Sequence, residues 1–290
     1  MATVMTNGFL PRANRLFRRL DIFFGRFRRD LAWLFTERKH FLGNFEKLMS
    51  EQHWIFLVGC NNSGTTLLHD LLVSSRHFNA MPHEGQRYTR VIRMAERRHH
   101  ERVWSEYIEY LRLTENDSTA QVPRLLHDWL RAMGKISSPY FLEKTTANAV
   151  RTRWLQKSFQ NSYFIGVVRN GYAVSEGICR KGNKSALRAG RHWRKVNEIL
   201  DADSAYLQNY MLLRYEDLAD NPFEQLSRIE TFLGLAAGSL TDRIDLSHVT
   251  NMNSTSIGSL SEAQVLVINQ EAGELLDRYG YQRPNHVSKT

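Results

Sequence analysis

Residues 54–72 read Trp-Ile-Phe-Leu-Val-Gly-Cys-Asn-Asn-Ser-Gly-Thr-Thr-Leu-Leu-His-Asp-Leu-Leu, and the class of fold follows from this stretch. Trp54 to Val58 form a continuous apolar run, which predicts a parallel strand covered on both faces. Gly59 and Gly64 bound a short loop, and leucines then recur with the spacing of a helix. A loop that enters a helix in this way aims backbone N–H groups and the positive end of the helix dipole at one point. The stretch therefore predicts a phosphate site.

The loop differs from a nucleoside-triphosphate loop in one respect. The spacing Gly59-x4-Gly64 is that of a P-loop, but Thr65 stands where the Walker loop has the Lys that reaches the β- and γ-phosphates. The next strongly apolar strand, residues 163–168, runs into Arg169 and offers no Walker-B carboxylate. The pattern argues against a kinase or NTPase. It favours a loop that binds a nucleotide with only one phosphate at its 5′ position. The alternative is a Gly-containing strand–helix turn that binds no ligand.

Four segments of the chain resemble one family in order and in content. Asn62-Ser-Gly-Thr-Thr66 resembles the 5′-phosphosulfate loop of sulfotransferases that use 3′-phosphoadenosine-5′-phosphosulfate (PAPS). Residues 164–181 are similar to the family's second signature, in which a strand ends in the Arg that binds the 3′-phosphate. Residues 141–150 are similar to the segment that carries a catalytic Lys in tyrosylprotein sulfotransferases. Residues 213–218, Leu-Arg-Tyr-Glu-Asp-Leu, match the family's strand-end Tyr-Glu-x-Leu.

This resemblance to PAPS-dependent sulfotransferases of the P-loop type implies an α/β fold of three layers, with a central parallel sheet flanked by helices. It also implies that PAPS is the donor, that adenosine 3′,5′-bisphosphate is the product, and that no metal is needed. The residues that it places in the donor site are Asn62, Ser63, Gly64, Thr65, Thr66, Arg169, Ser175 and Tyr215.

Two positions depart from the family's pattern. The 5′ loop of the family usually carries Lys or Arg just before Ser-Gly-Thr, where this chain has Asn62. The loop therefore lacks one cation, and Lys144 is the candidate to supply it. The 3′-phosphate site usually adds a Ser eight residues after the Arg, and here Gly177 takes that place, with Ser175 two residues early. Either Ser175 shifts in to replace that Ser or a backbone N–H binds instead.

Sulfonyl transfer calls for two catalytic groups. It puts negative charge on the bridging oxygen of the departing phosphate and requires a deprotonated acceptor hydroxyl, so a cation and a general base are needed. Lys144 is the candidate cation because it follows the strand at 140–143, at the carboxyl edge of the sheet. Glu84 is the candidate base, since a Glu takes a similar place in tyrosylprotein sulfotransferases. His83 is the rival base, and adjacent residues of an extended segment point to opposite faces, so we expect one of the two in the cleft.

Length, cysteine content and hydropathy bound the organisation of the protein. The 290 residues suffice for one α/β domain, expected at residues 46–286, after a basic amphipathic arm at residues 1–45. Cys60 lies in the phosphate loop and Cys179 in the helix after Arg169, which favours reduced thiols and a cytoplasmic location. No apolar run is long enough for a membrane span. The histidines lack partners at ligand spacing, so no metal site is predicted.

The formal net charge of +9 is concentrated in two places, the arm and residues 87–102. No helix-turn-helix, zinc-finger or RNA-binding signature accompanies the arginines, so no nucleic-acid partner is expected. The second cluster is either a solvated helix face or a site for an acidic acceptor. The arm interleaves arginines with Phe, Leu and Trp. It either docks on the domain or on a second subunit of a homodimer, or lies on an anionic membrane at the inner face.

A coarse reading of the remaining chain completes the fold. Strands are expected at 54–58, 140–143, 163–168 and 211–214, each followed by a helix. Residues 86–135 are expected to be mainly helical and to form the acceptor side of the cleft. Ser261 to Gln264 form a capping box before a core helix. The loop at 251–257 is a candidate contact with the donor.

The predicted function is transfer of a sulfonate from PAPS to a hydroxyl or similar acceptor, which is a small molecule, a lipid-linked molecule or a peptide. The alternatives are a kinase-like phosphotransferase with a P-loop and a non-catalytic basic protein that binds nucleic acid or anionic lipid. Binding of adenosine 3′,5′-bisphosphate, ATP–Mg²⁺ and duplex DNA distinguishes the three.

Overall fold

The structure is a computed structural model that describes Trp33 and residues 37–95, 100, 102–242, 244–247 and 249–284. Contacts between residues divide the chain into two units, residues 1–48 and 49–290. In the first unit, Trp33 and Phe45 both pack against Phe41. Most of the predicted arm, residues 1–45, lies outside the described residues, so the arm and its membrane contact stay predictions. Among the helices of the described residues, none has the length and apolar character needed to cross a membrane.

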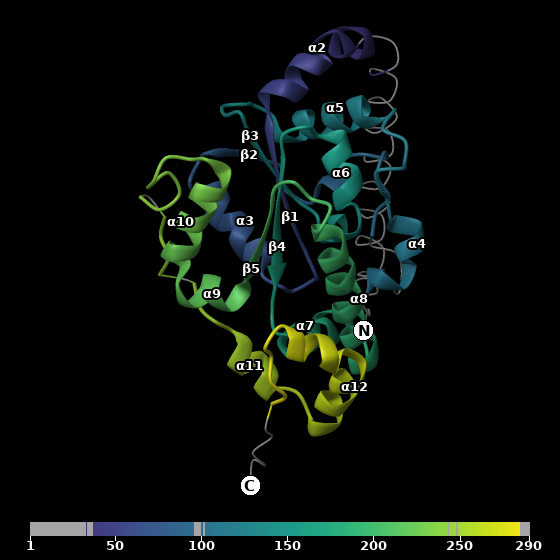
Figure 1. Ribbon diagram of the computed structural model, residues 1–290, viewed down its shortest axis with the longest axis vertical. Coiled ribbons are helices and arrows are strands. Elements are labelled where there is room, and N and C mark those ends of the chain that lie inside the picture. The colour runs from purple at the N-terminus through teal and green to yellow at the C-terminus, as the bar shows by residue number, and fades with distance from the viewer. Residues whose placement is uncertain are drawn as a thin grey trace, which may run out of the picture. The chain divides into compact units, whose positions relative to one another are not determined.

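A parallel sheet of five strands forms the centre of the second unit (Figure 1). The strands are β1 (His53–Gly59), β2 (Phe78–Ala80), β3 (Tyr140–Lys144), β4 (Ser162–Val168) and β5 (Tyr210–Arg214), in the order β2-β3-β1-β4-β5. All four adjacent pairs are parallel, so the carboxyl ends of the strands share one edge. The four predicted strands are confirmed within one or two residues at each end. The prediction missed β2, which has three residues and carries Asn79 between two apolar residues.

Helices cover both faces of the sheet, as expected. Figure 1 shows α3, α9 and α10 on one face and α5, α6 and α8 on the other, with α7, α11 and α12 beyond the carboxyl ends of the strands. Their bounds are α3 (Thr65–Ser74), α5 (Val122–Met133), α6 (Thr152–Ser158), α7 (Gly171–Gly182), α8 (Ala186–Ser204), α9 (Tyr215–Asp220), α10 (Pro222–Leu233), α11 (Asn253–Gly258) and α12 (Glu262–Arg278). A further helix, α2 (Arg38–Glu51), precedes β1. The Ser261 capping box is present at the start of α12.

The region at 86–135 is helical in part. It contains the short helices η2 (Gly85–Arg87), η3 (Trp104–Tyr107) and α4 (Ile108–Leu111) before α5. Irregular segments separate these helices, and residues 96–99 and 101 lie outside the described residues. A 3₁₀ helix, η4 (Thr146–Val150), follows β3.

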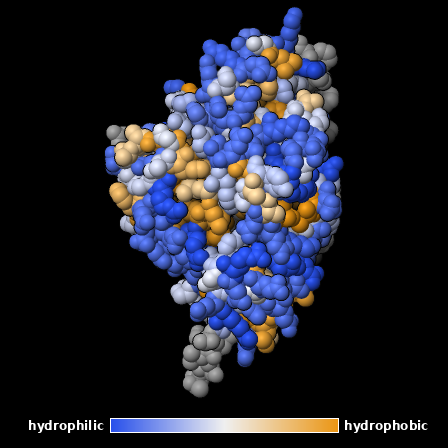
Figure 2. Space-filling model, viewed as in Figure 1, coloured by the Kyte–Doolittle hydropathy of each residue, from blue (hydrophilic) through white to orange (hydrophobic). Residues whose placement is uncertain are grey.

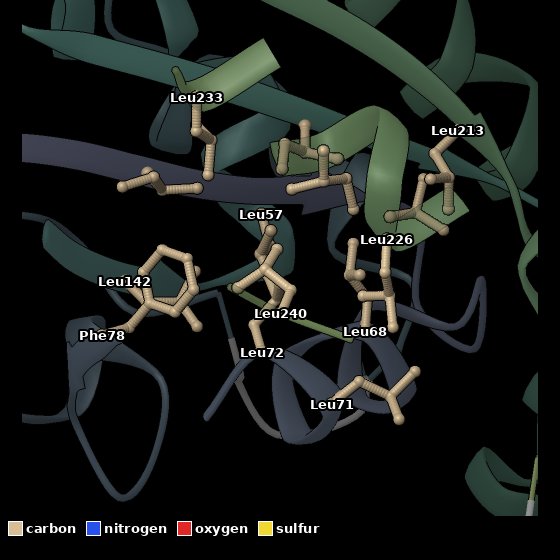
Figure 3. Packing of buried hydrophobic residues seen from close by; sticks show 14 of the residues in the cluster. Leu57, Leu68, Leu71, Leu72, Phe78, Leu142, Leu213, Leu226, Leu233 and Leu240 are labelled. Atoms are coloured by element: carbon tan, nitrogen blue, oxygen red, sulfur yellow. The ribbon is translucent and has the colours of Figure 1, made fainter. Parts of the chain in front are cut away.

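The two faces of the sheet bury different kinds of side chain. On one face an aliphatic cluster joins the strands to α3 and α10, and Figure 3 shows Leu57 of β1 opposite Leu68 and Leu72 of α3. On the other face the alternate residues of β1, Trp54 and Phe56, form an aromatic cluster. Trp54 packs at 5.4 Å from Trp129 of α5 and 5.0 Å from Phe141 of β3, measured between ring centroids. Burial on both faces explains why β1 has no polar alternation.

The surface can be followed on one face of the protein. The face of the protein in Figure 2 is mostly hydrophilic, and its apolar side chains gather in smaller patches. The core therefore lies between the sheet and its two helical layers, and the carboxyl edge of the sheet is left to carry polar groups.

Candidate active site

The loop between β1 and α3 has the backbone geometry of an anion site. Gly59 passes so close to β4 that a Cβ on it would lie 2.5 Å from the carbonyl oxygen of Val167. Gly64 has φ +102°, and a Cβ there would lie 2.6 Å from the ring of Tyr215. Between the two, Ser63 donates its hydroxyl to the carbonyl of Cys60 over 2.7 Å. These constraints hold the loop in one shape at the N-terminus of α3, where free N–H groups and the helix dipole favour an anion.

Arg169 lies beside this loop, at the end of β4. Its Nη1 donates to the carbonyl oxygen of Asn62 over 3.1 Å, and its Nε donates to Oδ1 of Asn253 over 2.8 Å. The guanidinium group also stacks on the ring of Tyr215, with its carbon 4.2 Å from the ring centroid. Glu216 orients Asn253 by accepting from its Nδ2 over 2.6 Å. Residues of three segments therefore hold Arg169 in place: the loop, the start of α9 and the start of α11.

Tyr215 connects the loop to the segment at 250–253. Its hydroxyl donates to the carbonyl of Thr250 and accepts from the N–H of Met252, both over 3.1 Å. The structure thus brings the predicted loop at 251–257 to Arg169 and Tyr215, with α11 beginning at Asn253. Three segments that are far apart in the sequence meet at one end of the sheet.

Three buried donors near or behind the loop have no hydrogen-bond partner among the residues that the structure describes. They are Nδ2 of Asn62, Nη2 of Arg169 and the hydroxyl of Ser175. Buried donors are normally paired, so each of these three donors has the capacity to bind a ligand or a water molecule. Asn62 and Arg169 are in contact with each other. Ser175 shares a helix face with Gly171, where a Cβ would meet Trp193 and Leu276, so its place in the donor site stays a prediction.

A cavity of about 300 Å³ lies beside the first turns of α3. Lys144 and Glu84 both line it, as do Thr66, His69, Asp70, Pro82, His83 and Arg87. Nζ of Lys144 donates to Oγ1 of Thr66 over 3.2 Å, so the candidate cation touches the phosphate loop. Gln86 orients the candidate base by donating from Nε2 to Oε2 of Glu84 over 2.6 Å.

His83 and Glu84 line the same cavity, contrary to the expectation that one of them points away. The chain turns into η2 at Gly85, immediately after Glu84. Strict alternation applies to an extended strand, and this turn ends it. His83 is exposed and Glu84 is half-buried.

A family model described as the sulfotransferase family matches residues 55–238, which is well over half of the chain. The chain belongs to the sulfotransferase family. It is also 25% identical over 309 aligned positions to the omega-hydroxy-beta-dihydromenaquinone-9 sulfotransferase Stf3 of Mycobacterium bovis, with 79% of this chain and 75% of that protein covered. The protein of the same description from Mycobacterium tuberculosis matches with the same identity and coverage.

Two solved structures are also similar. The sulfotransferase STF1 of Mycobacterium tuberculosis has a TM-score of 0.49 and 14% identity, over 84% of this chain and 81% of that one. The sulfotransferase domain from the curacin biosynthetic pathway has a TM-score of 0.48 and 18% identity, over 80% of this chain and 99% of that one.

The two departures from the sulfotransferase pattern lie in contact with each other. A Cβ on Gly177 would stand 3.2 Å from Cγ and Nδ2 of Asn62. The side chain of Asn62 therefore occupies the space beside the helix position where the family usually has Ser. The two positions, which sequence reasoning treated as two separate losses, are thus neighbours in space.

Sequence reasoning did not single out Arg102 as a residue of this site. Its Nη1 donates to Oδ1 of Asn62 over 3.0 Å, which leaves Nδ2 of Asn62 as the unpaired donor. Burial, followed by the charges of Arg102, Arg180 and Arg169, lowers the pKa of Lys181. Cations thus gather where the donor anion is expected. The basic cluster at 87–102 indicated that an arginine of this region could belong to the site, but the sequence did not indicate which one.

His192 of α8 supports the loop from behind and was also missed. It is fully buried, and its Nδ1 accepts from the N–H of Ser105 over 3.3 Å. That bond leaves Nε2 as the protonated nitrogen, which donates to Oδ1 of Asn61 over 3.2 Å. Burial lowers the pKa of His192 to about 3, so the ring is neutral at pH 7.

Neither thiols nor metal ligands form a second site in the described residues. Cys60 and Cys179 are free thiols, and burial raises the pKa of Cys60 far above its usual range. Within the described residues, no three His, Cys, Asp or Glu side chains come together as metal ligands would.

Proposed function

We propose that this sulfotransferase moves a sulfonate group from PAPS to a hydroxyl or similar acceptor. The observation that carries the proposal is the arrangement of groups about the loop at 59–64. Buried donors without a partner among the described residues lie at this loop, and a cavity lined by a lysine and a carboxylate begins at Thr66, in the first turn of α3. PAPS suits this arrangement, because it carries a 3′-phosphate and a 5′-phosphosulfate that need an anion site, and a sulfonate that must reach the acceptor.

The donor side is proposed to bind PAPS through the loop and Arg169. The N–H groups at Gly64 to Thr66 hold the 5′-phosphosulfate, as at other helix N-termini. Nη2 of Arg169 and Nδ2 of Asn62, both unpaired, bind the 3′-phosphate. Asn62 thereby takes the role that the family gives to a Ser on the following helix, and Arg102 orients it.

The chemical step is proposed to take place in the cavity beside Lys144. The acceptor oxygen attacks the sulfur, its proton passes to Glu84, and the bond from sulfur to the bridging oxygen breaks. The electron pair of that bond stays on the phosphate of adenosine 3′,5′-bisphosphate. Lys144 faces the leaving oxygen through its contact with the loop and stabilises the charge that develops there.

The acceptor is proposed to be a hydroxyl on a small or lipid-linked molecule. The mycobacterial relative is named for an omega-hydroxy menaquinone derivative as its acceptor. The cavity of this chain is lined mainly by polar side chains, so the reacting end of the acceptor is polar. A screen of lysate fractions with sulfur-labelled donor identifies the acceptor.

The donor assignment is tested by binding. We expect adenosine 3′,5′-bisphosphate to bind more tightly than adenosine 5′-monophosphate, ATP–Mg²⁺ or duplex DNA. Charge-assisted hydrogen bonds contribute about 1.5–3 kcal/mol, so Arg169→Ala should weaken bisphosphate binding by roughly 10- to 150-fold. Arg169→Lys should restore it in part, since the planar fork is lost. Equal affinity for the bisphosphate and the monophosphate would contradict the assignment.

The base is tested by turnover. Glu84→Gln should lower kcat by about 10²- to 10⁴-fold and change bisphosphate affinity little. His83→Ala is the matched control, because His83 lines the same cavity. A larger loss of activity in His83→Ala than in Glu84→Gln would make His83 the base.

The arm keeps its two alternatives, and a deletion separates them. If the arm contacts membranes, removal of residues 1–45 should abolish binding to anionic vesicles and leave bisphosphate affinity unchanged. If the arm docks on the domain of residues 46–286, the shortened chain should instead be insoluble or unfold at lower temperature.

A further inference from the structure

Glu143 is a buried carboxyl group between the two proposed catalytic residues. It directly precedes Lys144 on β3 and is fully inaccessible to solvent. Its Oε1 accepts from the N–H of Gly85 over 2.8 Å and from the hydroxyl of Thr145. Its Oε2 accepts from Nδ2 of Asn148 over 2.6 Å. One carboxylate therefore joins the strand of Lys144 to the turn that follows Glu84.

Gly85 is held at both of its backbone polar groups. Its N–H donates to Glu143, and its carbonyl accepts from Nε1 of Trp129 over 3.1 Å. A Cβ at this position would lie 2.7 Å from Oε1 of Glu143 and 2.8 Å from Nε1 of Trp129. The residue next to Glu84 can therefore move little unless Glu143 moves.

A buried cation completes the network. Asn148 accepts from Nη1 of Arg151 over 3.3 Å and passes the interaction to Glu143 through its Nδ2. Arg151 is fully buried and is held in place by the carbonyls of Leu111, over 2.9 Å, and Arg93, over 2.5 Å. Among the described residues, the charged groups that interact with Glu143 are Arg151 and Glu84.

We propose that Glu143 is a positioning residue of the sulfotransferase, which in its ionised form holds Glu84 at the distance from Lys144 that the reaction needs. The inference rests on the proposed function. Nothing in the proposed chemistry gives Glu143 contact with either substrate, so its effect on turnover passes through Glu84.

The proton on Glu143 decides whether this arrangement is intact. The three groups around the carboxylate all donate to it, so an added proton meets only donors unless the Thr145 hydroxyl reverses. Burial and, to a smaller extent, the charge of Glu84 raise the pKa of Glu143, while hydrogen bonds from Thr145, Gly85 and Asn148 lower it. The net result is a pKa of about 7. Turnover should therefore fall as pH drops through about 7.

The first test is the pH profile of kcat for the full-length enzyme and Glu143→Gln. The amide presents an NH₂ to Gly85 or to Asn148, both donors, so it cannot replace the carboxylate. We expect kcat to fall by roughly 10- to 100-fold, the range for displaced catalytic groups, with bisphosphate affinity unchanged. The fall in activity below pH 7 should also disappear. Glu230→Gln is the matched control, because Glu230 of α10 is also buried and accepts two backbone N–H groups, from Gly238 and Leu240, neither of which belongs to the proposed site.

The second test shifts the pKa without removing the carboxylate. Thr145→Val preserves the shape of the side chain and deletes one hydrogen bond that lowers the pKa of Glu143. The acid limb of kcat should move to higher pH by about one unit or more, since such a bond is worth roughly 1.5–3 kcal/mol. An acid limb that stays in place in both variants would overturn the proposal.

Two other outcomes are also decisive. The proposal limits the role of Glu143 to the positioning of Glu84. A Glu143→Gln variant that loses bisphosphate affinity as well as kcat, as a misfolded protein would, contradicts it. Absence of sulfonate transfer from PAPS by the unaltered enzyme would instead refute the proposed function.

Discussion

Two buried titratable groups, His192 and Glu143, should change the free energy of unfolding in opposite directions as pH falls. Mutation of one group should therefore reveal the contribution of the other. The pKa of His192 is lowered from 6.5 to about 3, and that of Glu143 is raised from 4.5 to about 7, in both cases by burial. Each pH unit over which the folded and unfolded states differ by one proton changes the free energy of unfolding by about 1.4 kcal/mol.

The signs of the two contributions are opposite. Below pH 6.5 the unfolded chain protonates His192 and the folded protein does not, so stability falls as pH falls toward about 3. Between pH 4.5 and about 7 the folded protein keeps a proton on Glu143 that the unfolded chain has lost, so stability rises as pH falls. Their slopes cancel between pH 4.5 and 6.5.

Each single variant should expose the slope of the other group. In Glu143→Gln the His192 slope is uncompensated, so stability should drop by about 2.7 kcal/mol relative to the unaltered protein between pH 6.5 and 4.5. His192→Gln should gain about the same amount over the same range, with its amide donating to Asn61 and accepting from Ser105. These changes are a large part of a typical total of about 5–15 kcal/mol.

The measurement is urea unfolding at pH 6.5, 5.5 and 4.5 for the unaltered protein, both variants and the double variant. Differences between proteins remove the contribution of all other titrating groups. The double variant should again run parallel to the unaltered protein. Parallel curves for all four proteins would refute the assignment of these protonation states.

Three further predictions concern the loop and its neighbours. Arg102→Ala should weaken bisphosphate binding by roughly fivefold, because Asn62 loses the bond that orients it, worth about 1 kcal/mol, and isothermal titration measures this. Lys144→Ala should lower kcat and also loosen the bisphosphate, unlike a change of the base; an unchanged affinity would place Lys144 away from the leaving group. Gly64→Ala should lower the melting temperature and bisphosphate affinity because its Cβ would lie 2.6 Å from an aromatic ring, whereas Gly258→Ala, with open space around it, should change neither.

The sheet and the proposed catalytic lysine could be predicted because their signals are local. The apolar runs at β1 and β4 are long enough to indicate buried strands, and the position of Lys144 at a strand end places it at the edge where ligands bind. Its contact with Thr66 follows from β1 and β3 being neighbours in a parallel sheet. β2 escaped notice because three residues carry no periodicity.

The supporting residues could not be predicted because their roles depend on contacts between distant segments. Arg102 reaches Asn62 across 40 positions, and Ser105 reaches His192 across 87. In the sequence, Arg102 is one of several arginines and His192 one of eleven histidines. The contact between Asn62 and Gly177 likewise becomes visible once α7 is packed against the loop.

The buried thiol of Cys60 makes the phosphate loop accessible to kinetic measurement. Because it is fully inaccessible and its pKa is raised by burial, it should react with a disulfide reagent only in molecules whose loop has opened. Cys179 is partly accessible, so its labelling depends less on opening of the structure. Its labelling rate serves as the internal reference. The ratio of the two labelling rates then measures how often the loop opens, and a nucleotide that closes it should slow Cys60 in proportion to its occupancy.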